Sequence, residues 1–127
     1  MQEWHFKRFI SGNGLNVIER WMAGLPDSAV AAIDVRLRHL EITAKWESQF
    51  FKKVKGHKNI FEIRIKDTVG KIQYRLLGCY GPKSKDFTLL IGATHKDNIY
   101  NPRDCFEIAD KNYRAFLKNK GNVDDYC

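Results

Sequence analysis

The chain has 127 residues, of which 43% are hydrophobic and 13% aromatic, so its composition and length predict one globular domain over residues 1–127 and exclude a disordered chain. No apolar run approaches the roughly 20 residues of a membrane span, and the first residues do not resemble a signal peptide, so we expect a cytoplasmic protein with no membrane partner. The net charge of +7 favours polyanionic partners such as nucleic acid or the ribosome.

The N-terminal part is predicted to contain one strand and two helices. Residues 3–9 alternate apolar and polar side chains as a strand does, and residues 15–23 have the apolar spacing of a short helix. Residues 28–44 place apolar side chains three and four positions apart, which predicts a clear amphipathic helix. Asp27 or Ser28 is a suitable N-cap for that helix.

The middle of the chain predicts three antiparallel strands. Residues 60–65, 72–76 and 87–96 all alternate with period two, so each strand has two distinct faces. One face of the first two strands is apolar, and the other collects polar and charged side chains. The polar face carries Glu62, Arg64, Gln73 and Arg75. We therefore expect a sheet that buries one side and presents a rigid cationic surface on the other.

The pairing of these strands can be predicted from their faces, because a slip of one residue would exchange the two faces. A turn at residues 67–70 closes the first hairpin and predicts that Arg64 lies opposite Gln73. In the second hairpin, consistent faces place Leu76 opposite Ile91. This register puts Lys96 on the cationic side and His95 on the buried side.

A basic segment precedes the first of these strands. Residues 46–56 have no clear secondary-structure pattern, although they contain apolar anchors. The segment is either a solvated loop over the edge of the core or a rim that contacts phosphate groups. The candidate RNA-binding residues are this basic set and one amide from the polar face: Lys52, Lys53, Lys55, His57, Lys58 and Gln73.

The C-terminal part is predicted to be one helix with a loose tail from residue 121. Asn101 is its expected N-cap and Pro102 its first helical residue. Apolar side chains also share the arginine side of the sheet, and we predict that this helix or a bound partner covers them. They are Ile60, Leu77, Cys79 and Leu90.

No conventional cofactor or metal motif is present. The histidines lack metal-ligand spacing, no phosphate-binding or dinucleotide-binding glycine loop occurs, and the acidic residues are scattered. The three cysteines form no Cys-x-x-Cys pair and are expected to be reduced thiols. We therefore expect neither a metal nor a cofactor.

What remains is a set of cations suited to metal-free RNA cleavage: Arg64, Arg75, His95 and Lys96. In this reaction the 2′-hydroxyl of the RNA attacks the adjacent phosphorus atom, and the protein stabilises the phosphorane and moves protons. Arginine binds phosphate oxygens bidentately, and lysine or histidine can transfer protons. The alternative is that Arg64 only pairs with Glu62 or Asp67 and that His95 is structural. Arg75 is expected to be exposed, so Arg75→Ala should hardly affect folding.

The sequence resembles the RelE/ParE superfamily of type II toxins, and the phage-derived HigB-like branch is the most similar. The motifs that carry the resemblance follow in order over residues 50–117: Glu62-Ile63-Arg64, Tyr74-Arg75, Lys96 through Pro102, and Glu107-Ile108-Ala109. The resemblance implies an α+β fold with a helical hairpin packed on a small, mainly antiparallel sheet of three to four strands and a C-terminal helix.

The resemblance also implies a function: a toxin that is a ribosome-dependent mRNA endonuclease, a hydrolase held inactive by a helix-turn-helix antitoxin encoded beside it. The family's active residues match Arg64, Arg75 and Lys96, and also Tyr100. Two alternatives use the same fold, namely a ParE-like protein that inhibits DNA gyrase without catalysis and a phage-derived interaction protein without activity.

Overall fold

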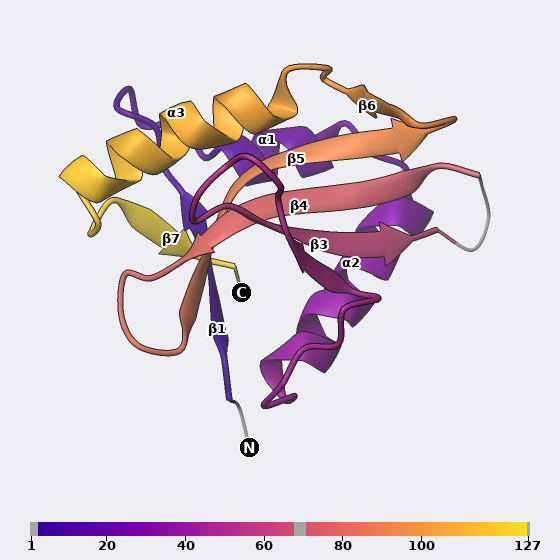
Figure 1. Cartoon of the computed structure of the whole chain (residues 1–127), viewed down its shortest axis with the longest axis horizontal. Helices are drawn as coiled ribbons and strands as arrows, with labels where there is room; N and C mark the ends of the chain where they lie inside the picture. The colour runs from indigo at the N-terminus through magenta and orange to yellow at the C-terminus, as the bar shows by residue number, and fades with distance from the viewer. Residues whose placement is uncertain (1–2, 68–70, 127) are drawn as a thin grey trace.

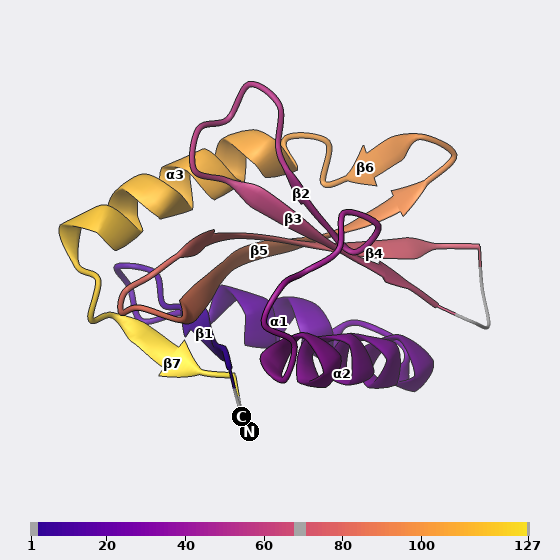
Figure 2. The ribbon, with the colours of Figure 1, turned by 60° about the horizontal axis from the view of Figure 1, so that its bottom comes forward.

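The structure, a computed structural model, describes residues 3–67 and 71–126. Its helices lie on both sides of one sheet, with α1 and α2 against one face and α3 against the other (Figures 1 and 2). In chain order the elements are β1 (His5–Phe9), α1 (Val17–Ala23), α2 (Asp27–Glu41), β2 (Phe51–Lys53), β3 (Phe61–Lys66), β4 (Gln73–Tyr80), β5 (Asp86–Lys96), β6 (Ile99–Asn101), α3 (Cys105–Lys118) and β7 (Val123–Asp125).

The described residues form a seven-stranded mixed sheet, so the predicted small sheet of three to four strands is wrong, although the fold is still α+β. The strand order is β2-β3-β4-β5-β1-β7, with β6 pairing to β5. β1 runs parallel to β5, and the pairing brings together segments from the two halves of the chain. β2, β6 and β7 have three residues each, which is too short for an alternating pattern to identify them.

The first hairpin differs from its predicted register by two residues. Arg64 pairs with Arg75, and Lys66 pairs with Gln73, so the predicted pairing of Arg64 with Gln73 is wrong. A shift of two residues keeps every side chain on its face, so Glu62, Arg64 and Arg75 still share one side of the sheet. The prediction used a turn at residues 67–70, and residues 68–70 lie outside the described part of the chain.

The second hairpin differs by one residue, and this difference exchanges faces. Leu76 pairs with Gly92, so the predicted pairing of Leu76 with Ile91 is wrong. The cause is a shift of register at Leu90, an extra residue in β5 that is skipped by the pairing with β4. The pairs on its two sides are Leu77 with Ile91 and Gly78 with Leu89.

The extra residue resets the alternation of β5. Before it, Phe87 and Leu89 pack in the core beneath α1 and α2. After it, Ala93 pairs with Arg75, and His95, two residues further on, lies on the arginine side of the sheet. Lys96 therefore points to the opposite side, which reverses the predicted placement of His95 and Lys96.

Two apolar cores fix the sheet between the helices. The first lies under α1 and α2, and the buried residues that the predicted amphipathic helix contributes to it are Ala29, Ile33, Leu37 and Leu40. The second lies under α3, which contributes Cys105, Ala109 and Phe116. This second core contains Ile60, Leu77, Cys79 and Leu90, so the prediction that the C-terminal helix covers these side chains is confirmed.

Two predicted helix starts need correction. α2 begins at Asp27 with Pro26 at the N-cap position and has no side-chain cap, so neither Asp27 nor Ser28 caps it. α3 begins at Cys105, because Asn101 belongs to β6 and not to the helix. Among the described residues, no helix has both the length and the apolar character to cross a membrane.

β6 exists because a tight turn folds the chain back on β5. Asp97 and Asn98 both have positive φ angles, 51° and 63°, and together they form a two-residue connection between Lys96 and Ile99. Asn and Asp tolerate this left-handed conformation better than most residues, and two such residues in succession favour a hairpin. The hairpin pairs His95 with Tyr100, which places the tyrosine at the polar side of the sheet.

The basic segment before β3 is held by an aromatic cluster. Trp46 donates from Nε1 to the carbonyl oxygen of Leu40 at 3.0 Å and stacks on Phe6 at a centroid distance of 5.5 Å. Phe51 of β2 stacks on Phe61 of β3 at 5.2 Å. These contacts fix β2 as the edge strand beside β3, so the backbone that carries the lysines is ordered structure.

Candidate functional site

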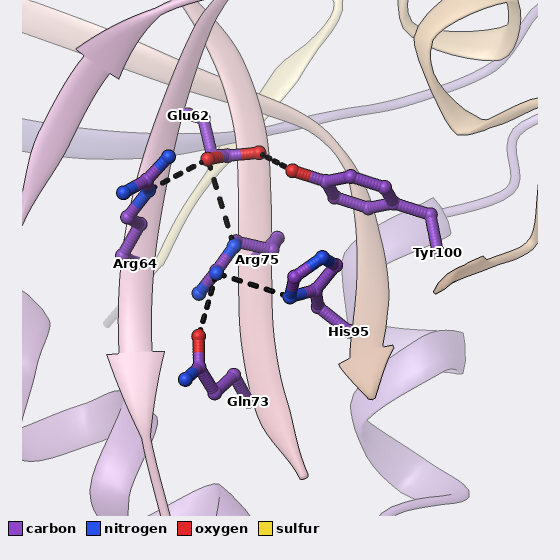
Figure 3. A network of polar contacts seen from close by, with 6 residues as sticks. All are labelled: Glu62, Arg64, Gln73, Arg75, His95 and Tyr100. Carbon is purple, nitrogen blue, oxygen red and sulfur yellow. Dashed lines mark hydrogen bonds and ion pairs between the residues drawn. The ribbon is translucent and has the colours of Figure 1, made fainter. Parts of the chain in front are cut away.

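A buried carboxylate is the centre of a polar cluster on the arginine side of the sheet (Figure 3). Glu62 on β3 is 3% exposed. Its Oε1 accepts a hydrogen bond from Nε of Arg64 at 2.9 Å and lies 3.5 Å from Nε of Arg75. Its Oε2 accepts a hydrogen bond from the hydroxyl of Tyr100 at 2.5 Å. One carboxylate therefore joins β3, β4 and β6.

Arg75 is the buried cation of this cluster. It is 4% exposed, so the expectation of an exposed side chain is wrong, and with it the expectation that Arg75→Ala would hardly affect folding. Nη2 donates to Oε1 of Gln73 at 2.6 Å and lies 3.3 Å from Nδ1 of His95. Figure 3 shows Glu62 and Gln73 on opposite sides of the Arg75 guanidinium. The guanidinium is thus held in one orientation by three neighbours.

His95 on β5 is half-buried and neutral near pH 7. Burial lowers its pKa, and the positive charges of Arg75 and Arg64 lower it further, whereas Glu62 acts in the opposite direction. A guanidinium can only donate, so Nδ1 of His95 accepts from Arg75 and the ring proton lies on Nε2. The imidazole therefore has one N–H available as a donor.

Tyr100 reaches the cluster from β6. Burial raises the pKa of its phenol to about 12, and the hydrogen bond to Glu62 and the negative charge of that carboxylate raise it as well. The side chain is therefore a neutral donor at physiological pH. Its ring lies 4.6 Å from the His95 ring and 4.9 Å from the Phe106 ring, centroid to centroid. Phe106 belongs to α3, so this helix packs against the tyrosine.

The lysines of β2 adjoin the same cluster. A hollow of about 350 Å³ lies beside Glu62, and a basic rim surrounds it. Its polar lining residues are Lys52, Lys53, Lys55, Glu62, Arg64 and Tyr100. A larger hollow of about 460 Å³ continues along the segment after β2 and is lined by Lys53, Lys55, His57 and Lys58. The predicted basic rim and the arginine cluster are therefore neighbours.

Two predicted site residues have other surroundings. Lys96 is exposed on the opposite side of β5, where it pairs with Ile99, and the structure does not bring it to the cluster. Nδ1 of His57 forms a hydrogen bond with Oδ2 of Asp110 on α3. This contact ties the basic segment to the helix, so His57 has a structural partner as well as a place beside the lysines.

Glu62 is a functional candidate that sequence reasoning named only as a possible ion-pair partner of Arg64. That pairing is confirmed, but Glu62 was not placed among the candidate site residues. The available signal was its position two residues before Arg64 on one strand, because side chains at this spacing share a face. A carboxylate between two arginines on one side of a sheet is a natural ion-pair centre.

Other reactive groups in the described part of the chain do not form a site. Among residues 3–67 and 71–126, no group of three or more His, Cys, Asp or Glu side chains could hold a metal ion. Burial raises the pKa of Cys79 to about 12 and that of Cys105 to about 11, so both thiols stay protonated and unreactive at neutral pH. Cys127 lies outside the described residues.

Comparisons with protein-family models, with curated proteins and with solved structures found no match to this chain. The resemblance to the RelE/ParE superfamily therefore rests on the sequence motifs alone.

Proposed function

We propose that the protein is a type II toxin that cleaves mRNA on the ribosome, with the 2′-hydroxyl of the RNA as the nucleophile. The observation that supports this most is the Glu62-centred cluster beside a lysine-lined hollow. A carboxylate, two guanidinium groups, a neutral imidazole and a phenol are joined by a chain of hydrogen bonds and one ion pair. This set matches what transesterification of a phosphodiester requires.

The arginine and the lysines have separate tasks in this proposal. The side chain of Arg64 is 35% exposed, which leaves its guanidinium free to bind the scissile phosphate while Nε stays on Glu62. Lys52 and Lys53 are exposed at the edge strand and contact phosphates further along the RNA. Arg75 supports Arg64 indirectly, because it holds the Glu62 carboxylate in place and adds positive electrostatic potential at the site.

The proposed reaction forms a bond between the 2′-oxygen and phosphorus and breaks the bond between phosphorus and the 5′-oxygen. The products are a 2′,3′-cyclic phosphate and a 5′-hydroxyl end. Glu62 is the carboxylate able to accept the proton of the 2′-hydroxyl. Tyr100, through its hydroxyl, is the candidate proton donor toward the leaving 5′-oxygen, and the neutral His95 can stabilise that oxygen with a hydrogen bond from the N–H of Nε2.

The proposed partner is an antitoxin encoded beside the toxin gene, and the proposed location is the cytoplasm. With a net charge of +7, the toxin should attract an antitoxin segment rich in Asp or Glu. The association rate should then fall as the salt concentration rises, because salt screens long-range attraction. An association rate that does not depend on salt would contradict the electrostatic part of this proposal.

The test is cleavage of mRNA by purified protein with ribosomes, mapped by primer extension. Arg64→Ala should lower the cleavage rate roughly 10²–10³-fold, by analogy with deletion of one oxyanion donor. Its melting temperature should change little, because the side chain is part-exposed. Arg38→Ala on the exposed surface of α2 is the matched control, with the same loss of charge and an unchanged rate expected. Equal cleavage by wild type and Arg64→Ala would refute the catalytic role.

The burial of Glu62 and Arg75 supports a second candidate function. The two groups form a buried ion pair, so the cluster could serve only to tie the sheet of an interaction protein or of a gyrase inhibitor. Growth arrest without mRNA cleavage, together with inhibition of DNA supercoiling by the purified protein, would favour this function over the nuclease.

A further inference from the structure

A third hollow meets the cluster at Arg64. It has a volume of about 290 Å³ and lies where α2 and the segment before β2 approach the C-terminal end of β3. Its polar and charged lining residues are Arg36, Gln49, Arg64, Lys66, Gln73 and Arg75. Arg64 is the one described residue that lines both this hollow and the lysine-lined hollow beside Glu62. The two hollows therefore adjoin each other at Arg64.

The charge of this hollow is unbalanced. Four of its described lining residues are cations and none is acidic. Glu62 contacts Arg64 and Arg75, but it lines the neighbouring hollow and not this one. One carboxylate serves these two arginines, and neither Arg36 nor Lys66 forms an ion pair within the described part of the chain. Cations held this close repel one another, and a bound anion would relieve the repulsion.

Arg36 is prepared for a ligand by its packing. Its guanidinium carbon lies 3.7 Å from the centre of the Phe50 ring, a stacked cation–π contact. Stacking uses the face of the guanidinium and leaves the N–H groups in its plane for an acceptor. Nε is buried and has no hydrogen-bond partner among residues 3–67 and 71–126. Because Nε has no exposed surface, a ligand in the hollow would contact the terminal N–H groups of the guanidinium.

The remaining lining groups favour a nucleotide over a simple ion. Gln73 uses its Oε1 to accept from Arg75, and its amide nitrogen points away from that arginine (Figure 3). Gln49 adds a second amide at the rim. These amides can bond the hydroxyl groups of a sugar or the edge of a base. The volume is near the lower end of the range of small-molecule sites, roughly 300–1,000 Å³, which suits one nucleotide unit and not a larger ligand.

We propose that this hollow is a phosphate-binding subsite for one nucleotide, in which Arg36 and Lys66 bind a phosphate group that is separate from the phosphate on Arg64. The phosphate has two possible sources with the same chemistry, a free mononucleotide or the next nucleotide of an RNA strand that crosses Arg64. If the phosphate belongs to an RNA strand, the inference rests on the proposed function. It then adds the direction in which the strand continues beyond the scissile phosphate.

The test measures binding by calorimetry with four probes: inorganic phosphate, adenosine 5′-monophosphate, adenosine, and an all-2′-deoxy hexanucleotide that cannot be cleaved because it lacks the nucleophile. Arg36→Gln and Lys66→Gln should each weaken binding of the phosphate-containing probe at least about tenfold, the loss of one charge-assisted contact. Arg38→Gln is the matched control on the same helix, exposed and two residues further along. It should bind as the wild type does, and adenosine should not bind.

The probes separate the two sources. Binding of the mononucleotide that depends on Arg36 and Lys66 identifies a free nucleotide as a sufficient ligand. Binding of the hexanucleotide alone, with the same dependence, identifies the strand. No binding of any phosphate-containing probe, or binding that neither variant weakens, would overturn the inference. Arg36→Gln also removes the contact with Phe50, so melting temperatures are recorded, and the exposed Lys66 gives a result even if Arg36→Gln does not fold.

The outcome is independent of the nuclease test. If phosphate binding depends on Arg36 but the protein never cleaves RNA, the subsite is supported and the proposed nuclease is refuted. If cleavage depends on Arg64 but neither Arg36→Gln nor Lys66→Gln weakens phosphate binding, the nuclease is supported and the subsite is refuted.

Discussion

Arg64 and Arg75 occupy directly opposite positions on β3 and β4, and a single oxygen of Glu62 contacts both of their side chains. Like charges placed opposite each other weaken an antiparallel pair. The carboxylate converts this repulsion into a link between the strands, because its Oε1 lies 2.9 Å from Nε of Arg64 and 3.5 Å from Nε of Arg75. The stability of this part of the sheet should therefore depend on one negative charge.

Glu62→Gln should lower the free energy of unfolding by about 3 kcal/mol, because removal of one partner of a buried ion pair leaves an uncompensated buried charge on Arg75. Urea denaturation at neutral pH measures the change. Glu107→Gln on the exposed surface of α3 is the control and should have almost no effect. Equal stability of the two variants would show that Arg75 does not need the carboxylate.

Tyr100→Phe should destabilise the protein by roughly 1.5–3 kcal/mol, the usual range for a hydrogen bond to a charged group. A pH titration of tyrosine absorbance gives an independent measurement, since the pKa of this phenol is raised to about 12 from 10.0. The folded protein holds this proton after the unfolded chain has lost it, so this contribution to stability is complete below pH 10 and is lost as pH rises toward 12. The wild type should show one tyrosine that titrates near pH 12 and that is missing from Tyr100→Phe. Identical titration curves near pH 12 would contradict the assignment.

The stability of the protein should fall in mild acid because of His95. Its pKa is lowered from 6.5 in the folded state, so the unfolded chain binds a proton that the folded protein resists. Stability is therefore lost as pH falls below 6.5 toward the folded pKa. His95→Asn, which keeps a side-chain oxygen able to accept from Arg75, should reduce the slope of stability against pH in this window. The same change at exposed His5 is the control, and identical slopes for wild type and His95→Asn would refute the prediction.

Gly92→Ala should destabilise the protein by about 1–3 kcal/mol through overpacking. A Cβ atom on Gly92 would lie 2.2 Å from Cε3 of Trp21 on α1, so the indole ring has to move. Gly12→Ala is the control, because no atom lies within 4 Å of the position that its Cβ would occupy. In a Trp21→Leu background the Gly92→Ala change should cost less, and a thermal-melt cycle of the four proteins measures this coupling. Additive effects would show that the ring is not the obstacle.

The parts of the fold that local patterns specify were predictable. The spacing of Ile33, Leu37 and Leu40 identified α2, and strict alternation identified β3 and β4 with the correct faces. The three-residue strands were not predictable, because two or three residues cannot establish a period. The parallel pairing of β1 with β5 joins distant segments, and no local signal specifies it.

The sequence predicted which residues form the site better than it predicted their burial and orientation. Arg64, Arg75, Gln73 and Tyr100 do come together, because residues two apart on a strand share a face and β6 folds back on β5. The burial of Arg75 could not be read from its strand, because it depends on β6 and α3, which close over that face. Lys96 was misplaced for a different reason, the extra residue in β5.

The extra residue Leu90 has a consequence for any alignment of this chain with a related sequence. Leu90 separates β5 into an apolar half and a half that carries His95, and each half keeps its own alternation. In a relative whose strand has the same number of residues but pairs regularly, without the bulge, the residue aligned with Lys96, and not the one aligned with His95, would face the arginines. The chemistry of an aligned residue in this strand can therefore be assigned only after the bulge has been located.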